Sequence, residues 1–206
     1  MNPLSENALK VLESRYLRRN LKGELAETPD ELFMRVARAV AEAELAWGTH
    51  SDEEKWQSVF YESMKELFFL PNSPTLMNAG TSLNQLSACF VLPVEDNLDG
   101  IFTTLKNAAL IQQSGGGTGF NFSHLRPAHD LISLTGGQAS GPVSFMKVFN
   151  CATEYVKYGG KRRGANMGIL NVDNPDIEEF VVSKKEENVL NNFNIFNLNI
   201  LSCKEF

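Results

Sequence analysis

The stretch Gln85-Leu-Ser-Ala-Cys-Phe-Val-Leu-Pro-Val-Glu-Asp96 is the most informative part of this chain, because it places one cysteine inside an apolar run that ends in a carboxylate-bearing turn. Branched and aromatic residues bounded by proline predict a β-strand over residues 86–92. On such a strand a free cysteine usually fills space, since cysteine is among the most buried residue types. Taken without its surroundings, the stretch therefore favours a packing role for Cys89.

The composition limits the classes of function. The chain has 206 residues, 43% of them hydrophobic, and a formal net charge of -6. This length allows a small helical domain joined to part of a larger one. An acidic chain has no general attraction for nucleic acid, so we expect no such partner. Three cysteines at wide spacings favour a reducing compartment, so we expect cytoplasmic localisation. No apolar run approaches the roughly 20 residues that span a bilayer, so we expect no membrane partner.

Helical signals fill the first 70 residues. Apolar residues recur near helical spacing from Ser5, a candidate N-cap, to Leu17. Thr28 followed by proline predicts a second helix that continues to Trp47. A third helix is predicted from Ser51 to Leu67, with Ser51 and Glu54 forming a capping box.

After Pro71 the texture changes to short apolar runs separated by Gly, Pro and Asn. The pattern predicts strands at 86–92, 119–122 and 167–170, and helices at 98–113 and 143–158. Asn174-Pro175-Asp176 predicts a further helix through Ser183, and the tail from Asn191 begins as a strand. Strands that alternate with helices indicate an α/β architecture.

Three glycine-containing segments invite a ligand-binding interpretation. Ser114-Gly-Gly-Gly-Thr-Gly119 lacks the Gly-Lys-Ser/Thr ending of a phosphate loop and follows a helix, so we expect its glycines to allow close backbone approach. Residues 135–141 form a polar loop, and residues 157–163 form a strongly basic one. A charge run is usually a solvated face, yet guanidinium groups beside glycines can also close on an anion. The three histidines show no metal-ligand spacing and give no ground for a metal site.

Three motifs then occur in the order of a known family. They are Pro71-Asn-Ser-Pro-Thr-Leu-Met-Asn-Ala-Gly80, the stretch from Gln85 to Asp96, and Gly159-Gly-Lys-Arg-Arg-Gly-Ala-Asn-Met-Gly168. With them the chain resembles the large catalytic subunit of ribonucleotide reductases, most closely the adenosylcobalamin-dependent class II enzymes. That family's polypeptides are several times longer, so we expect an N-terminal fragment that is inactive alone.

The resemblance implies a fold and a reaction. Residues 1–70 would be a helical N-terminal region, and residues 71–206 would be the first, incomplete part of a ten-stranded α/β barrel. The reaction would be radical reduction of ribonucleoside diphosphates to deoxyribonucleotides. Cys89 would then be one of two cysteines oxidised to a disulfide, with its partner outside this chain. The implied substrate contacts are Ser73, Ser87 and Ala88, although the segment around Ser73 could also be an ordinary turn.

The resemblance also implies a dNTP effector site. Asp96 would accept from the deoxyribose 3'-hydroxyl and Arg126 would meet the phosphates, whereas spacing alone favours a surface salt bridge for both. The basic loop, through Lys157, Tyr158 and Arg162, would relay the identity of the effector base from a dimer interface to the substrate pocket.

Cofactor and partners follow from the same resemblance. The cofactor would be adenosylcobalamin, and the partners would be a thioredoxin-type reductant, the remaining part of the reductase in trans and a second copy in a homodimer. Three alternatives stay open. Under a class I interpretation a separate subunit would generate the radical, and under a non-catalytic one the chain would be a dNTP-binding regulatory module. The third is a non-functional remnant whose core is too incomplete to fold well.

Overall fold

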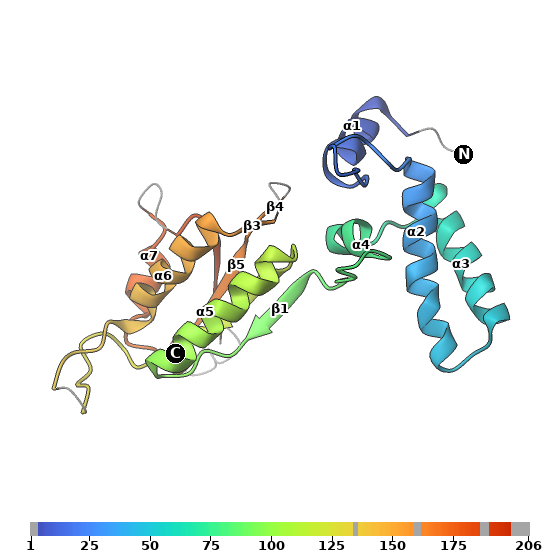
Figure 1. Cartoon of the computed structure of the whole chain (residues 1–206). Coiled ribbons are helices and arrows are strands. Elements are labelled where there is room, and N and C mark those ends of the chain that lie inside the picture. Colours follow the sequence, from blue (N-terminus) through green and yellow to red (C-terminus); the bar gives the residue numbers. More distant parts are fainter. Residues whose placement is uncertain (1–3, 134–135, 159–161, 186–189, 199–206) are drawn as a thin grey trace. The chain divides into compact units, whose positions relative to one another are not determined.

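The structure is a computed structural model that describes residues 4–133, 136–158, 162–185 and 190–198 (Figure 1). The chain divides into two compact units, Met1–Ala88 and Cys89–Phe206. The first unit extends beyond residue 70, where the texture of the sequence changes, because the short helix that follows packs on the helical core.

The first unit is helical. Its elements are α1 (Glu6–Arg15), α2 (Pro29–Ala41), the 3-10 helix η1 (Glu42–Ala46), α3 (His50–Lys65) and α4 (Ser73–Asn78). Helices α2 and α3 pack along each other, as Figure 1 shows. A small core has eight buried residues, half of them on the apolar side of α2: Leu17, Leu32, Phe33, Val36, Ala37, Met64, Leu76 and Ala79.

Helix caps match the sequence signals at two helices and differ at the third. The Ser5 hydroxyl accepts from the amide of Ala8, and Thr28 caps α2 in a full capping box. For α3 the predicted cap was wrong. The helix begins earlier, and Thr49 and Asp52 form the capping box instead of Ser51 and Glu54. Two Ser/Thr-x-x-Asp/Glu patterns overlap here, one starting at Thr49 and one at Ser51. Only Thr49 has the extended backbone of a cap residue, because Ser51 already lies inside the helix.

The second unit contains a four-stranded parallel sheet. Its strands are β1 (Cys89–Leu92), β2 (Gly117–Asn121), β5 (Asn166–Asn171) and β6 (Phe193–Leu198), in the order β1-β2-β5-β6. Each new strand is therefore added beside the previous one. A parallel sheet that grows in one direction in chain order is typical of an α/β barrel, whereas a doubly wound sheet reverses its order. The predicted α/β fold with an incomplete barrel is confirmed.

Helices cover one face of this sheet. They are α5 (Leu98–Gln113), α6 (Gly141–Tyr155) and α7 (Ile177–Val182), and Figure 1 shows α5 and α6 in front of the strands. The bounds of α5 agree with the prediction. The core between helices and sheet is rich in phenylalanine, with ring centroids of Phe120 and Phe149 4.7 Å apart in an edge-to-face arrangement. Inward residues alternate along β2 and β5, and this face holds Phe120, Leu170 and, from β6, Phe193.

Several local features differ from the predictions. Helix α6 ends at Tyr155, because the chain turns into the short strands β3 (Lys157–Tyr158) and β4 (Arg162–Arg163), which pair antiparallel. Strand β1 begins only at Cys89. Asp176 precedes α7 but its side chain does not cap the helix; instead it accepts from the backbone amide of Ala128, at 2.8 Å. A 3-10 turn, η2 (Phe122–His124), follows β2.

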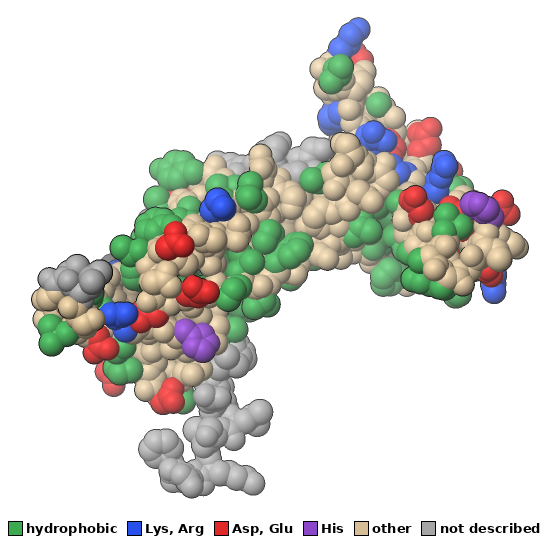
Figure 2. All heavy atoms as spheres, turned by 60° about the horizontal axis from the view of Figure 1, so that its bottom comes forward, with side chains coloured by type: hydrophobic (Ala, Val, Ile, Leu, Met, Phe, Trp, Pro, Cys, Tyr) green, Lys and Arg blue, Asp and Glu red, His purple; other side chains and the backbone are tan. Residues whose placement is uncertain are grey.

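Apolar side chains remain at the surface of both units, and Figure 2 shows hydrophobic groups scattered between charged ones. In the second unit they include Val91, Leu98, Phe102 and Leu110. An incomplete barrel leaves apolar surface uncovered. Within the part of the chain that the structure describes, no helix has the length and apolar character that a bilayer crossing needs.

Candidate functional site

Cys89 lies on the face of the sheet that the helices leave open. Alternation along β1 turns Phe90 and Leu92 toward the core and leaves Cys89 and Val91 exposed, Val91 by 85%. In register, Cys89 stands opposite Gly117 of β2. The space-filling interpretation of Cys89 is therefore wrong, because its thiol reaches the surface. An accessible thiol can react, and its redox role stays a prediction.

Two glycines of the Ser114–Gly119 segment have different reasons to be glycine. A Cβ on Gly116 would come within 2.7 Å of Ile111 and 2.9 Å of the Phe90 ring, so close packing of α5 on β1 requires glycine there. A Cβ on Gly119 would meet only ordinary contacts, the nearest with Met167 at 3.5 Å. Glycine inside a strand often marks close approach by a ligand. The close backbone approach expected for the whole segment therefore holds at Gly116 and not at Gly119.

The predicted substrate residues Ser73, Ser87 and Ala88 come from two segments that are joined by hydrogen bonds. Ser73 is the first residue of α4, which Asn72 caps by accepting from the amide of Thr75 at 2.9 Å. The hydroxyl of Thr75 donates to the carbonyl of Leu86 at 2.8 Å, one residue before Ser87. The segment around Ser73 is thus a helix and not an ordinary turn.

Ser73 has a further partner that the sequence argument did not find. Its hydroxyl lies 2.9 Å from the hydroxyl of Tyr16, across 57 positions of sequence. Asn78, at the other end of α4, donates to the carbonyl of Gln85 at 3.1 Å. The short helix is therefore tied to its neighbours at both ends. Fixed placement of this kind is what a binding residue needs.

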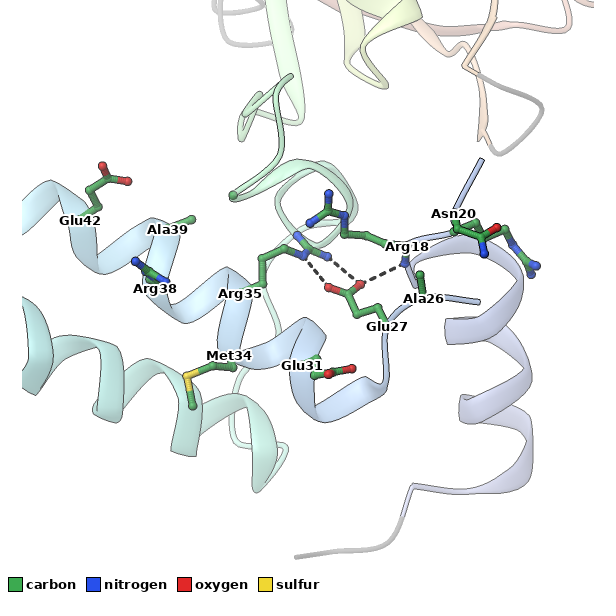
Figure 3. A pocket seen from close by; sticks show the side chains of 12 residues that line it. Arg18, Asn20, Ala26, Glu27, Glu31, Met34, Arg35, Arg38, Ala39 and Glu42 are labelled. Carbon is green, nitrogen blue, oxygen red and sulfur yellow. Dashed lines mark hydrogen bonds and ion pairs between the residues drawn. The ribbon is translucent and has the colours of Figure 1, made fainter. Parts of the chain in front are cut away.

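An ion pair between α2 and the segment before it also holds α4 in place. Figure 3 shows Arg35 and Glu27 pointing toward each other, and their Nε and Oε1 atoms are 2.6 Å apart, with side chains 10% and 6% exposed. Arg35 also donates to the carbonyl of Leu76 at 3.2 Å and to that of Ala79. Glu27 accepts in addition from the backbone amide of Arg18 at 3.0 Å. The guanidinium thus satisfies carbonyls at the C-terminal end of α4.

Asp96 and Arg126, the predicted effector residues of the second unit, contact each other directly. Arg126 Nε donates to Asp96 Oδ2 at 2.8 Å, and the Arg126 backbone amide lies 3.2 Å from Asp96 Oδ1. Their side chains are 37% and 36% exposed. The structure thus brings together two residues that lie 30 positions apart, in the salt bridge that spacing alone had favoured. Binding of a dNTP by this pair stays a prediction.

The remaining effector residues lie in the strand pair β3 and β4, here called the basic strand pair. Its register places Lys157 opposite Arg163 and Tyr158 opposite Arg162. The side chains of Lys157, Tyr158 and Arg162 lie outside the described residues, as do residues 159–161 entirely. In the polar loop, Thr135 also lies outside the described residues, and the flanking segments pair through Leu131 and Gln138.

Three cavities lie in the first unit. The one in Figure 3 has a volume of about 740 Å³ and is lined largely by arginine and glutamate side chains. Two narrower ones, about 310 and 360 Å³, follow α3. Adenosylcobalamin is much bulkier than the two narrower cavities, and the third is lined largely by charged side chains, so these three cavities do not suit it and we derive no chemical step through it.

A helical unit followed by parallel strands in chain order defines an α/β-barrel protein whose helical domain precedes the barrel in the sequence. Residues 87–201 match the ribonucleotide reductase barrel domain, and residues 3–84 match the all-alpha domain of the same proteins. The chain belongs to the ribonucleotide reductase family.

Named relatives agree with this assignment. The vitamin B12-dependent ribonucleoside-diphosphate reductase of Thermoplasma acidophilum is 47% identical, with 93% of this chain and 32% of the relative covered. The vitamin B12-dependent enzyme of Mycobacterium tuberculosis is 51% identical, with 89% and 26% covered. The ribonucleoside-diphosphate reductase large subunit of Trypanosoma brucei brucei is 38% identical, with 85% and 21% covered. The chain thus spans between 21% and 32% of the length of these relatives.

Proposed function

We propose that the chain is part of a ribonucleoside-diphosphate reductase, which reduces ribonucleotides to deoxyribonucleotides by a radical mechanism. The observation that carries this proposal is the exposed thiol of Cys89 on the open face of the sheet, in a segment that matches the reductase barrel domain. Relatives over most of the chain bear the name of this activity.

The chemistry assigns one reducing equivalent to Cys89. Loss of the ribose 2'-hydroxyl consumes two electrons and two protons: two thiols become one disulfide, and the hydroxyl leaves as water. Cys89 supplies one thiol, and a cysteine outside this chain supplies the other. A thioredoxin-type reductant then restores both thiols. Ser73, Ser87 and Ala88 hold the substrate diphosphate and ribose through hydroxyl and main-chain groups.

The radical source we infer is adenosylcobalamin, because relatives at 47% and 51% identity are named vitamin B12-dependent. The three cavities of the first unit do not suit it, so we infer that its site includes parts of the protein outside the described residues. Cytoplasmic localisation and a homodimer belong to the same proposal. So does control by dNTP effectors at Asp96, Arg126 and the basic strand pair.

The test is reduction of CDP. The chain is mixed with the remaining part of the Thermoplasma acidophilum relative, adenosylcobalamin and a dithiol, and dCDP is measured by chromatography. We expect dCDP in this mixture and none without the chain. Cys89→Ser should abolish dCDP formation, whereas Cys151→Ser should retain it, because Cys151 is an exposed thiol on α6, remote from β1 in sequence.

Equal loss in the Cys89 and Cys151 variants would contradict the assignment of Cys89. Calorimetric titration of the chain with dTTP and dATP separates the alternative function. Saturable dNTP binding without dCDP, in a mixture where the complete relative is active, would identify a regulatory module. If the chain shows no dNTP binding and the mixture forms no dCDP, both functions are ruled out.

A further inference from the structure

A buried polar network lies on the helix-covered side of the sheet, next to the residues that flank the basic strand pair in sequence. Gln112, at the end of α5, directs its amide nitrogen at three acceptors: Asn166 Oδ1 at 2.8 Å, Thr118 Oγ1 at 3.0 Å and Thr153 Oγ1 at 3.3 Å. All four side chains are buried. Buried amides in such networks must find partners, and cooperative bonding stiffens the groups that take part.

The other bonds of the network complete its connections. Thr118 donates to Asn166 Oδ1 at 2.7 Å, and the amide of Asn166 donates to Thr153 at 2.8 Å. Thr153 in turn donates to the carbonyl of Phe149 within α6, at 2.8 Å. The network therefore joins α5, α6, β2 and β5 through side chains alone.

Two members of the network bracket the basic strand pair in sequence. Thr153 lies four residues before Lys157, and Asn166 lies three residues after Arg163. Gly164 sits directly against the network, because a Cβ there would be 2.6 Å from Thr153 Cγ2 and 3.1 Å from Gln112 Oε1. Strand β3 itself packs on α5. Both ends of the segment that carries the pair are thus held by one side chain.

We propose that Gln112 is a positioning residue for the basic strand pair: it ties Thr153 and Asn166 together and so sets where the pair lies relative to a bound effector. This inference rests on the proposed function, in which Lys157, Tyr158 and Arg162 respond to the effector. A short strand pair has few bonds of its own, so the placement of its ends decides its geometry. Gln112 contacts no effector and acts only through this placement.

The experiment compares Gln112→Met with Gln113→Met in the full chain. Both replacements keep the length of the side chain, but Gln113 is exposed and serves as the matched control. We expect Gln112→Met to raise the Kd of dTTP or dATP, measured by calorimetry, about tenfold or more, since bonds of this kind typically contribute that much. Gln113→Met should leave both affinities unchanged.

A second readout needs no nucleotide. Trypsin cleaves after the basic residues of the strand pair, and cleavage after Lys147 within α6 provides an internal reference. Gln112→Met should accelerate cleavage at the pair severalfold relative to Lys147, because loosened ends open more often. If wild type binds neither nucleotide, the proposed effector site fails, while the cleavage ratio still decides whether Gln112 positions the strand pair.

The inference is overturned if folded Gln112→Met keeps both the wild-type affinities and the wild-type cleavage ratio. Should Gln112→Met not fold, Gly164→Ala decides, because its methyl group displaces the same network without removing a hydrogen-bonding group. Gly164→Ala should then show the same weaker dNTP binding and faster cleavage, and wild-type values for it would overturn the proposal.

Discussion

Arg126 and Asp96 form an ion pair with 2.8 Å between Nε and Oδ2, and each side chain keeps about a third of its surface exposed. Each residue therefore presents a free side to solvent while the partner holds its orientation. A dNTP would bring phosphates for the guanidinium and a hydroxyl donor for the carboxylate. The surface salt bridge and the effector contact are thus compatible roles of the same two residues.

The first prediction concerns this pair. Arg126→Ala should cost less than about 1 kcal/mol of folding stability, since exposed ion pairs contribute little. It should raise the Kd of dTTP about tenfold or more, because bonds between charged groups and phosphate are stronger. Calorimetry and urea unfolding measure the two quantities.

Lys147→Ala is the control for Arg126→Ala, because it removes an exposed positive charge from α6 in the same unit. Equal weakening of dTTP binding in both variants would reduce the effect to overall charge. A large loss of stability in Arg126→Ala with unchanged dTTP affinity would assign the pair a purely structural role.

The second prediction separates two glycines of one segment. Gly116→Ala should destabilise the fold by about 1–3 kcal/mol, because its methyl group overlaps Ile111 and the Phe90 ring. Gly119→Ala should stay within about 1 kcal/mol of wild type, since its methyl group has room. If a nucleotide approaches the open face beside Cys89, Gly119→Ala should nevertheless lower dCDP formation in the reconstituted assay. Wild-type dCDP formation by Gly119→Ala would argue against such approach.

The third prediction concerns the buried pair behind α4. Arg35→Met should destabilise the first unit by about 3–5 kcal/mol, because it leaves the carboxylate of Glu27 buried without its partner. Adding Glu27→Leu should recover much of this loss, although the carbonyls of Leu76 and Ala79 stay unsatisfied. Denaturant unfolding of the single and double variants measures the coupling, and simple additivity would mean that the pair does not act as a unit.

The fourth prediction is a pH dependence. Hydrogen bonds from the backbone amide and then from the hydroxyl of Thr49 lower the pKa of Asp52. A carboxyl group whose pKa is lower in the folded state stabilises above its unfolded pKa of about 3.9, and the contribution is lost as the pH falls through the folded value. The thermal midpoint should therefore fall less between pH 7 and pH 3 in Asp52→Asn than in wild type.

Glu54→Gln is the matched control for Asp52→Asn, because Glu54 lies two residues further along α3 and outside the capping box. It should show the wild-type fall in thermal midpoint. If Asp52→Asn and Glu54→Gln behave alike, the capping box contributes nothing measurable to acid sensitivity.

Local patterns predicted most of the elements. Periodicity and end signals placed α5 within its observed bounds and the start of α2 at Pro29, because caps and apolar spacing act over a few residues. The cap of α3 was misplaced by two residues, where two similar patterns overlap. The helix α4 was left open as a turn, because its stability comes from Arg35 and from the Leu86 carbonyl, which lie far away in sequence.

By itself the sequence determined the helical and α/β halves, the order of the motifs and the family to which they point, since all of these are carried by residues near one another in the chain. The tertiary structure alone decided that Cys89 is exposed, that Asp96 meets Arg126, and that Gln112 joins the ends of the basic strand pair. The second depends on the pairing of β1 with β2, and the first and third depend on which face of the sheet the helices cover. That choice is made by burial of apolar surface between distant segments, which no local pattern records.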